Sequence, residues 1–198
     1  ALTNLLNLDT VVDDDNLQIL KLIKTSAQGL KNSLDTYIDH LKLADSAEIM
    51  LKEVSFDEVL SEVQDTISAL IQASEAKFIV DFSALPTVLF NYPYLESIFL
   101  NFISNSIKYA KQNVAPKIEI SSKIVNGKKI LIYKDSGLGF DMNRVGDKIF
   151  DLHQGFHGNQ DSKGVGLYLV RNQVTKLGGK ITAESHVNVG TTFTITFK

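Results

Sequence analysis

The chain has 198 residues, of which 44% are hydrophobic and 22% charged, so it is long enough for one or two folded domains with a sizeable core. Its net charge of −3 argues against a general electrostatic surface for nucleic acid or an anionic membrane, and its lack of cysteine excludes disulfides and thiolate metal sites. There is no apolar run of membrane-spanning length and no signal-peptide pattern, so we expect a cytoplasmic chain that contacts neither membrane nor nucleic acid.

The first part of the chain predicts two helices. Residues 1–12 have a helical pattern that ends at a polar turn, Asp13 to Asn16, which can cap the next helix. That second helix carries the narrow apolar seam of a coiled coil or helical bundle, at Leu20, Ile23, Ala27, Leu30, Leu34, Tyr37 and Leu41. Because two helices bury such a seam poorly, we expect residues 1–48 to form an antiparallel hairpin that dimerises into a four-helix bundle. The alternative is one amphipathic helix packed on its own domain.

Residues 49–198 predict a second domain, of the α+β class. Ser55 to Glu58 match a capping box that opens a helix with apolar residues on one face as far as Ile71. Strand patterns follow, two of them joined by an Asn126-Gly127 hairpin signal, at residues 77–83, 87–90, 117–123, 128–134 and 192–197. Helices on one face of a largely antiparallel sheet make an α/β sandwich, and the stretch from Asp141 to Lys163 is predicted to be irregular.

One predicted helix, residues 95–110 after Pro93, has two faces of different chemistry. Apolar residues follow the helical period at 95, 98, 99, 102, 103 and 107. The opposite face carries Asn101, Asn105 and Lys108, which present two amide oxygens and an ammonium group. Amide oxygens can hold Mg²⁺ beside a triphosphate and lysine can neutralise phosphate charge, whereas the alternative is an ordinary solvated helix face.

Two glycine-containing segments predict further parts of a ligand site. A strand ends at Asp135, followed by Gly137 and Gly139, where a carboxylate on a floor of glycine could accept a hydrogen bond from an adenine amine; the alternative is a common Asp-Ser-Gly turn. Later, the segment Lys163-Gly164-Val165-Gly166-Leu167 opens an amphipathic helix, so free N–H groups and the positive helix end should face a phosphate. A lone Gly-x-Gly before a helix is weak evidence by itself.

These motifs occur in the order of a known family. The Asn-x-x-x-Asn helix, the Asp-x-Gly-x-Gly turn, the glycine-opened helix and the segment Gly190-Thr191-Thr192-Phe193 together resemble the ATP-binding domain of sensor histidine kinases. The seam helix in front is similar to the second helix of their dimerisation and phosphotransfer hairpin, so the resemblance covers essentially the whole chain. It implies an ATP-binding domain of the Bergerat type, in the GHKL superfamily, with ATP and Mg²⁺ as cofactors.

The resemblance also implies roles for particular residues. Asn105 would ligate Mg²⁺, Asn101 would support the metal and the phosphates, and Lys108 and Tyr109 would lie against the nucleotide. Asp135 would accept a hydrogen bond from the adenine amine. The other ATP-binding residues that it implies shape the base pocket, cradle the phosphates or belong to the last motif: Gly137, Gly139, Lys163, Gly164, Val165, Gly166, Leu167 and Thr192.

The predicted lid departs from the family pattern. Phe150 and Phe156 resemble the aromatic lid residues of the family, with plain packing as the alternative. Gln154 and Gly155 stand between them, where similar lids often carry basic residues. Contact with phosphate would therefore fall to the remaining cationic or titratable side chains nearby, Lys163, His157 or Lys108.

The histidines show no spacing typical of a zinc site. The resemblance places the phosphoacceptor histidine about one helical turn before Ala1, so we expect that it is absent from this chain and that a longer parent protein carries it. His40 lies in the second helix, the wrong helix for an acceptor, and His186 is expected in a turn. His153 and His157 belong to the predicted lid.

The resemblance implies the catalytic core of a sensor histidine kinase of a two-component system. Such a homodimer would transfer the γ-phosphate of ATP to a histidine and then to an aspartate of a response-regulator receiver domain. An upstream sensor domain, in a parent protein that could be anchored in a membrane, would control it, and this fragment would not autophosphorylate. One alternative is an ATP-hydrolysing clamp like gyrase or MutL, although their base glutamate is replaced here by Asn101. Another is a nucleotide-binding scaffold or pseudokinase.

Overall fold

The computed structural model describes residues 50–151 and 165–198 of the chain. Several predictions for other parts lie outside the described residues: the helical hairpin of residues 1–48 with the boundary at its end, and His40, His153, Phe156 and His157. In the described ranges, no helix is both long and apolar enough to cross a membrane.

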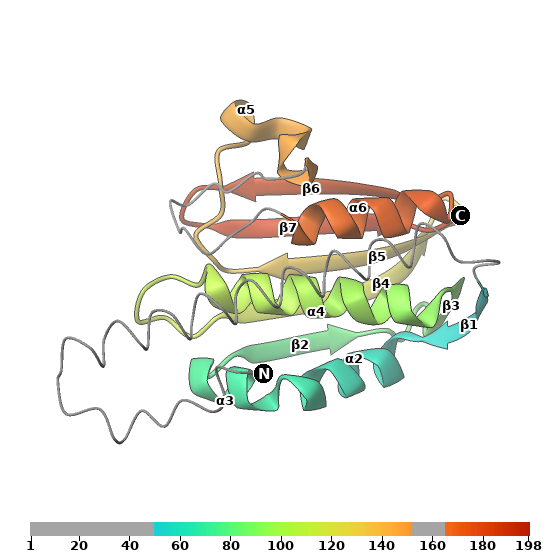
Figure 1. Cartoon of the computed structure of the whole chain (residues 1–198), viewed down its shortest axis with the longest axis horizontal. Coiled ribbons are helices and arrows are strands. Elements are labelled where there is room, and N and C mark those ends of the chain that lie inside the picture. The colour runs from blue at the N-terminus through green and yellow to red at the C-terminus, as the bar shows by residue number, and fades with distance from the viewer. Residues whose placement is uncertain (1–49, 152–164) are drawn as a thin grey trace, which may run out of the picture. The chain divides into compact units, whose positions relative to one another are not determined.

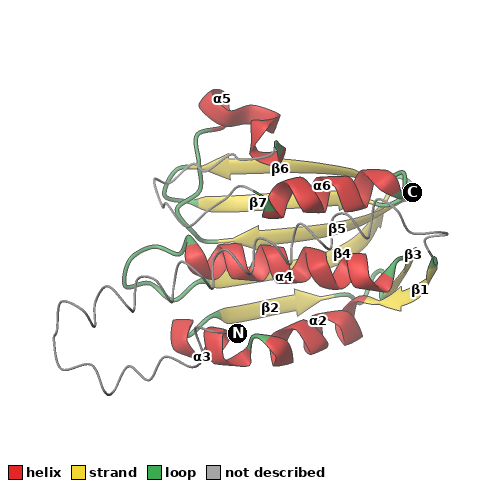
Figure 2. Cartoon of the chain, in the orientation of Figure 1, coloured by secondary structure: helices red, strands yellow, loops and turns green. Residues whose placement is uncertain are grey.

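The described part of the chain contains both helices and strands, interspersed along the sequence, as Figure 2 shows. In chain order they are β1 (Lys52–Ser55), α2 (Phe56–Thr66), α3 (Ser68–Ser74), β2 (Lys77–Asp81), β3 (Thr87–Phe90), α4 (Tyr92–Lys108), β4 (Lys117–Val125), β5 (Lys128–Asp135), α5 (Met142–Val145), the 3₁₀ helix η3 (Gly146–Phe150), α6 (Gly166–Lys176), β6 (Lys180–His186) and β7 (Gly190–Thr196).

The main sheet has five strands in the order β2-β4-β5-β7-β6 (Figure 1). All neighbouring pairs are antiparallel except β2 and β4, which are parallel, and β1 pairs with β3 in a separate antiparallel ribbon. The predicted hairpin turn is present, because Val125 pairs with Lys128 and both Asn126 and Gly127 have positive φ angles. The prediction of a mixed α+β domain with a largely antiparallel sheet is confirmed.

The helices α2, α4 and α6 lie on the same face of the main sheet in Figures 1 and 2. Alternation along the strands fits this arrangement, because Leu131 and Tyr133 of β5 and Phe193 and Ile195 of β7 are buried while the residues between them are more exposed. The core therefore lies between the helices and one sheet face.

Helix α4 is the central element of this layer. Asn91 caps it by accepting a hydrogen bond from Tyr94 N at 3.1 Å. The predicted apolar face is confirmed, because its residues Leu95, Ile98, Phe99, Phe102 and Ile103 are at most 1% exposed. Burial of one such phenylalanine contributes about 2–3 kcal/mol, so this face fixes which side of α4 is left for polar residues.

Two local predictions were wrong. The helix predicted from Ser55 to Ile71 breaks at Ile67 into α2 and α3, where Thr66 Oγ1 donates to Glu62 O at 2.8 Å and competes with the helical pattern. The stretch from Asp141 to Lys163 is not irregular throughout, because residues 142–150 form α5 and η3. These helices span only four and five residues, too few for a periodic pattern to predict them.

Candidate functional site

The two asparagines of α4 face the beginning of α6. Asn101 and Asn105 are both partly buried. Asn101 Nδ2 donates to Ser97 O at 2.8 Å, which leaves its Oδ1 directed away from its own helix. A Cβ atom added to Gly166 would lie 2.5 Å from Asn101 Oδ1 and 3.9 Å from Asn105 Nδ2. The amide groups and the first residue of α6 are therefore neighbours, and glycine at 166 leaves the space that Asn101 occupies.

The beginning of α6 supplies backbone donors at the same place. The helix runs over 11 residues from Gly166, after Val165, and no side chain of the described residues caps its first turn. A helix of this length has a partial positive charge at its N-terminus, so its free N–H groups suit an anion. The prediction of a glycine-opened helix is confirmed from Gly166 onward, whereas Lys163 and Gly164 lie outside the described residues.

Asp135 lies at the end of β5, on the strand face that the helices cover. Its Oδ1 accepts hydrogen bonds from Gly137 N at 2.8 Å and from Thr191 N at 3.3 Å. Burial raises the pKa of the Asp135 carboxyl, while those two hydrogen bonds and the positive charge of Lys111 act in the opposite direction. Asp135 is thus a partly buried acceptor held in one orientation.

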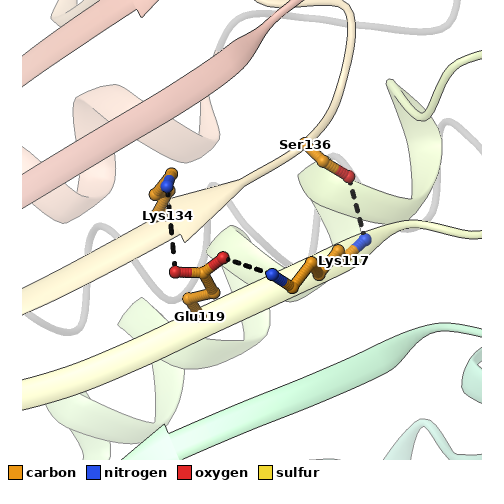
Figure 3. A network of polar contacts seen from close by, with 4 residues as sticks. All are labelled: Lys117, Glu119, Lys134 and Ser136. Atoms are coloured by element: carbon orange, nitrogen blue, oxygen red, sulfur yellow. Dashed lines mark hydrogen bonds and ion pairs between the residues drawn. The ribbon is translucent and has the colours of Figure 1, made fainter.

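The turn after Asp135 is tied to three neighbouring elements. Leu138 N donates to Tyr109 O at 2.9 Å at the end of α4, and Phe140 N donates to Ser185 Oγ at 2.9 Å in β6. At the beginning of β4, Lys117 N donates to Ser136 Oγ at 3.0 Å, beside the ion pairs of Glu119 with Lys117 and Lys134 (Figure 3). These contacts fix the turn relative to α4, β4 and β6.

Three glycines are required by the close packing of this turn. A Cβ on Gly137 would lie 2.8 Å from Tyr109 O, so a larger residue would push the turn away from α4. Gly139 and Gly190 have φ angles of +58° and +136°, and a Cβ on either would come within about 2.1 Å of a backbone oxygen. The glycine floor predicted around Asp135 therefore has a steric cause.

The remaining predicted residues lie in different surroundings. Lys108 is exposed, with its Nζ 5.6 Å from the centre of the Tyr109 ring. Leu167 and Val165 are partly buried at the beginning of α6. Phe150 is only 2% exposed and packs edge-on against Phe193, with ring centres 6.4 Å apart. This contact fits plain packing, the alternative to a lid role for Phe150.

Thr192 does not lie beside Asp135. Its Cα partners are Lys134 and Glu184, so its side chain is on the sheet face away from the helices. Thr191 has that position instead, paired with Asp135 and 6% exposed, with its Oγ1 2.9 Å from Ser185 Oγ. Residues 191 and 193 lie on the same face of β7, so the alternation that places Phe193 toward the helices also places Thr191 there. This alternation is the sequence signal for Thr191 as the residue beside Asp135.

The donor set near α6 is suited to a hard cation only in part. Among the residues that the structure describes, no group of three His, Cys, Asp or Glu side chains could hold a metal ion. The Asn101 and Asn105 side chains offer neutral oxygen ligands, and Mg²⁺ commonly takes one or two protein ligands with the rest from phosphate and water. These residues fit Mg²⁺ that arrives with a phosphorylated ligand.

Comparisons with known proteins agree on one family. The sequence pattern of the histidine kinase-, DNA gyrase B- and HSP90-like ATPases matches residues 91–198, more than half of the chain. The signal transduction histidine-protein kinase ArlS of Staphylococcus haemolyticus is 30% identical over 84% of this chain and 38% of its own length. The sensor protein RprX of Bacteroides fragilis is 26% identical over 75% of this chain and 30% of its own length. The chain thus spans only 38% of the length of the first relative and 30% of the length of the second.

Solved structures share the fold. The catalytic domain of histidine kinase ThkA is 23% identical, with a TM-score of 0.63 over 75% of this chain and 97% of that domain. Full-length ShkA in complex with AMPPNP is 20% identical, with a TM-score of 0.74 over 96% of this chain and 40% of ShkA. With the match over residues 91–198 and relatives that are sensor histidine kinases, the chain belongs to the family of histidine kinase-, DNA gyrase B- and HSP90-like ATPases.

Proposed function

We propose that this chain is the ATP-binding catalytic part of a sensor histidine kinase. The observation that carries the proposal is that one stretch, from Asn101 in α4 to Tyr109 at its end, contacts both the beginning of α6 and the turn after Asp135. Asn101 Oδ1 adjoins Gly166 at the beginning of α6, while Tyr109 O accepts the hydrogen bond from Leu138 in the turn after Asp135. Residues 101 and 109 are about 12 Å apart along a helix, a length comparable to that of a nucleoside triphosphate.

The base would bind at the Asp135 end of this stretch. Asp135 accepts a hydrogen bond from the adenine amine, because its carboxylate is an acceptor held in place by Gly137 N and Thr191 N. Gly137 and Gly139 keep side chains out of the base pocket, and Tyr109 lies against the nucleotide. Thr192 is left out of this proposal, and Thr191 takes its place beside the base.

The phosphates would bind at the α6 end. The free N–H groups of Val165, Gly166 and Leu167 face the phosphates, together with the predicted residues Lys163 and Gly164. Asn105 is the protein ligand for Mg²⁺, Asn101 supports it, and Lys108 offers a positive charge to the phosphates. When bound, Mg²⁺ supplies neutralisation of phosphate charge, and this chain holds the triphosphate in a fixed orientation for transfer.

Transfer to a histidine is favoured over hydrolysis by the residue at position 101. The clamp ATPases of this superfamily use a glutamate base one turn before the metal-binding asparagine, and Asn101 has an amide that cannot accept the proton of a water molecule. Phosphate would then pass from the histidine of a dimeric helical hairpin to a receiver-domain aspartate, under control of an upstream sensor domain. We expect no phosphohistidine on this 198-residue polypeptide alone, which mass spectrometry at neutral pH after incubation with Mg²⁺ and ATP would detect.

Calorimetry with AMPPNP tests the nucleotide site. We expect binding that is stronger with Mg²⁺ than with EDTA, loss of the Mg²⁺ effect in Asn105→Ala, and loss of most binding in Asp135→Ala. Ser83→Ala, an exposed serine bonded to Asp81 outside the proposed site, is the control and should bind normally. Absence of AMPPNP binding by the unsubstituted chain would contradict the proposal.

A further inference from the structure

A buried pair of hydroxyl groups joins α4 to β5 beneath the proposed site. Ser106 is 3% exposed and Tyr133 is 1% exposed, and their hydroxyl oxygens lie 2.8 Å apart. Ser106 Oγ also lies 2.9 Å from the carbonyl oxygen of Phe102. The pair lies within an otherwise apolar layer, where an unpaired polar group would be costly.

The direction of these hydrogen bonds follows from the number of protons. A carbonyl oxygen only accepts, so Ser106 donates its single proton to Phe102 O. Tyr133 must therefore donate to Ser106 Oγ. Burial raises the pKa of Tyr133 well above its usual value, so Tyr133 keeps its proton and remains the donor at physiological pH.

The two hydroxyl groups are close in sequence to the two ends of the proposed site. Ser106 directly follows Asn105 on α4. Tyr133 precedes Asp135 by two residues on β5, so both side chains are on the same strand face about 7 Å apart along the strand. The bond between Ser106 and Tyr133 is thus a direct connection between the element of Asn105 and the element of Asp135.

Aromatic packing around the pair also holds the two layers together. The Tyr133 ring lies 4.8 Å from the Phe102 ring, which stacks on Phe193 at 4.7 Å. Dispersion contacts between rings are not directional, so they restrict sliding of one layer over another less sharply than a directional bond does. A hydrogen bond tolerates only a narrow range of distance and angle, so the hydroxyl pair, together with the bond from Leu138 N to Tyr109 O, sets where α4 lies along β5.

We propose that Ser106 and Tyr133 are positioning residues that set the distance between Asn105 and Asp135, and so allow one nucleotide to use both. This inference rests on the proposed function. The pair has no contact with the nucleotide in this inference. Its expected effect is on how well one nucleotide can bind Asp135 with its base and, through Mg²⁺, Asn105 with its phosphates at the same time.

The test compares affinity for AMPPNP in Mg²⁺ with affinity in EDTA, alongside thermal unfolding. Tyr133→Phe is the first variant, because Ser106 keeps its bond to Phe102 O and no buried donor is left unpaired. Ser106→Ala is the second variant, and it provides the same affinity measurement if Tyr133→Phe does not fold. Ser122→Ala is the matched control: Ser122 of β4 is also 3% exposed, and it donates to Leu85 O and not to a residue of α4.

We expect Tyr133→Phe and Ser106→Ala each to reduce the gain in affinity from Mg²⁺ by about tenfold, the size of a typical coupling between neighbouring groups. Affinity in EDTA should change by less than about threefold, since the base end is intact. The double variant should lose no more than the single variants, because the two residues act as one pair. Ser122→Ala should lower the unfolding temperature but keep the whole gain.

Two results would overturn the inference in distinguishable ways. If Tyr133→Phe and Ser106→Ala keep the full Mg²⁺ gain and only unfold earlier, as Ser122→Ala does, the pair is merely structural. If the unsubstituted chain shows no Mg²⁺-dependent binding, the proposed function fails and the inference fails with it.

Discussion

The backbone N–H of Thr191 donates a hydrogen bond to Asp135 Oδ1 at 3.3 Å, across the β5–β7 pair. The same oxygen accepts from Gly137 N at 2.8 Å. From the described part of the chain, Asp135 Oδ2 receives no hydrogen bond. The protein therefore uses one carboxylate oxygen to fix the side chain, and we infer that the other accepts from the adenine amine.

Asp135→Asn should separate ligand binding from stability. An asparagine can still accept from Gly137 and Thr191 through one oxygen, but it would present an NH₂ group where the adenine amine needs an acceptor. We expect AMPPNP affinity to fall by at least about 30-fold, which corresponds to about 2 kcal/mol. Calorimetry measures this loss.

The same variant should unfold at an equal or higher temperature at pH 7–8. The pKa of Asp135 is raised in the folded chain, so its contribution to stability is fully present below the unfolded pKa and is lost as pH rises through the folded pKa. Asparagine avoids that loss, and its advantage should disappear on acidification toward pH 4. A lower unfolding temperature at neutral pH would contradict the assignment of burial as the main cause of the raised pKa.

Nucleotide affinity should depend on pH through the same carboxyl group. Protonation removes its negative charge and weakens it as an acceptor, and the raised pKa means that this loss begins above the ordinary aspartate value of 3.8. Calorimetry with ADP in EDTA from pH 7 down toward pH 4 should show weakening in the unsubstituted chain. A residual pH dependence of the same size in Asp135→Asn would point to a different titrating group.

Gly139→Ala should be much more destabilising than Gly127→Ala. Both glycines have positive φ angles, +58° and +75°, so both variants carry the backbone strain of about 1–2 kcal/mol. At Gly139 the added Cβ would also lie 2.1 Å from His186 O, whereas nothing lies within 4 Å of a Cβ at Gly127. Urea unfolding should give a loss at least about 2 kcal/mol larger for Gly139→Ala. Equal losses would show that the turn can move away from β6.

Gly166→Ala should impair the phosphate end with little effect on stability. The added Cβ would lie 2.5 Å from Asn101 Oδ1, and a side-chain amide can rotate away at the cost of its bond to Ser97 O. We expect the unfolding free energy to change by less than about 1 kcal/mol and the Mg²⁺-dependent gain in AMPPNP affinity to fall by about tenfold. Ser83→Ala, at an exposed serine outside the proposed site, is the control and should keep the whole gain. An unchanged gain in Gly166→Ala would remove Asn101 from the proposed site.

Much of this architecture could be predicted because its signals are local. The apolar period of α4 predicted both its buried face and its asparagine face, and the strand followed by Asp135 and glycines predicted the turn. Thr191 could have been separated from Thr192 by the strand alternation, because Thr191 has the same parity as Phe193 and Ile195, but its pairing with Asp135 depends on the register of β7 against β5. Helices as short as α5 and η3 carry no period at all.

Contacts between distant residues were also beyond reach of the sequence. Ser106 and Tyr133 lie 27 residues apart on a helix and a strand, and neither pattern indicates that their hydroxyl groups meet. The approach of Gly166 to Asn101 depends in the same way on how α6 packs on α4. Pairings of this kind are set by tertiary packing, which local propensity does not encode.

Amide hydrogen exchange with and without Mg²⁺ and AMPPNP shows whether the Asp135 turn and the first turn of α6 bind one nucleotide, because it locates the nucleotide on the chain. Bound nucleotide should slow exchange in residues 101–111, 135–140 and 165–169, while the β4–β5 hairpin around Gly127 exchanges as before. Protection confined to other segments, or no protection in either the Asp135 turn or the first turn of α6, would contradict the claim that these elements form one nucleotide site.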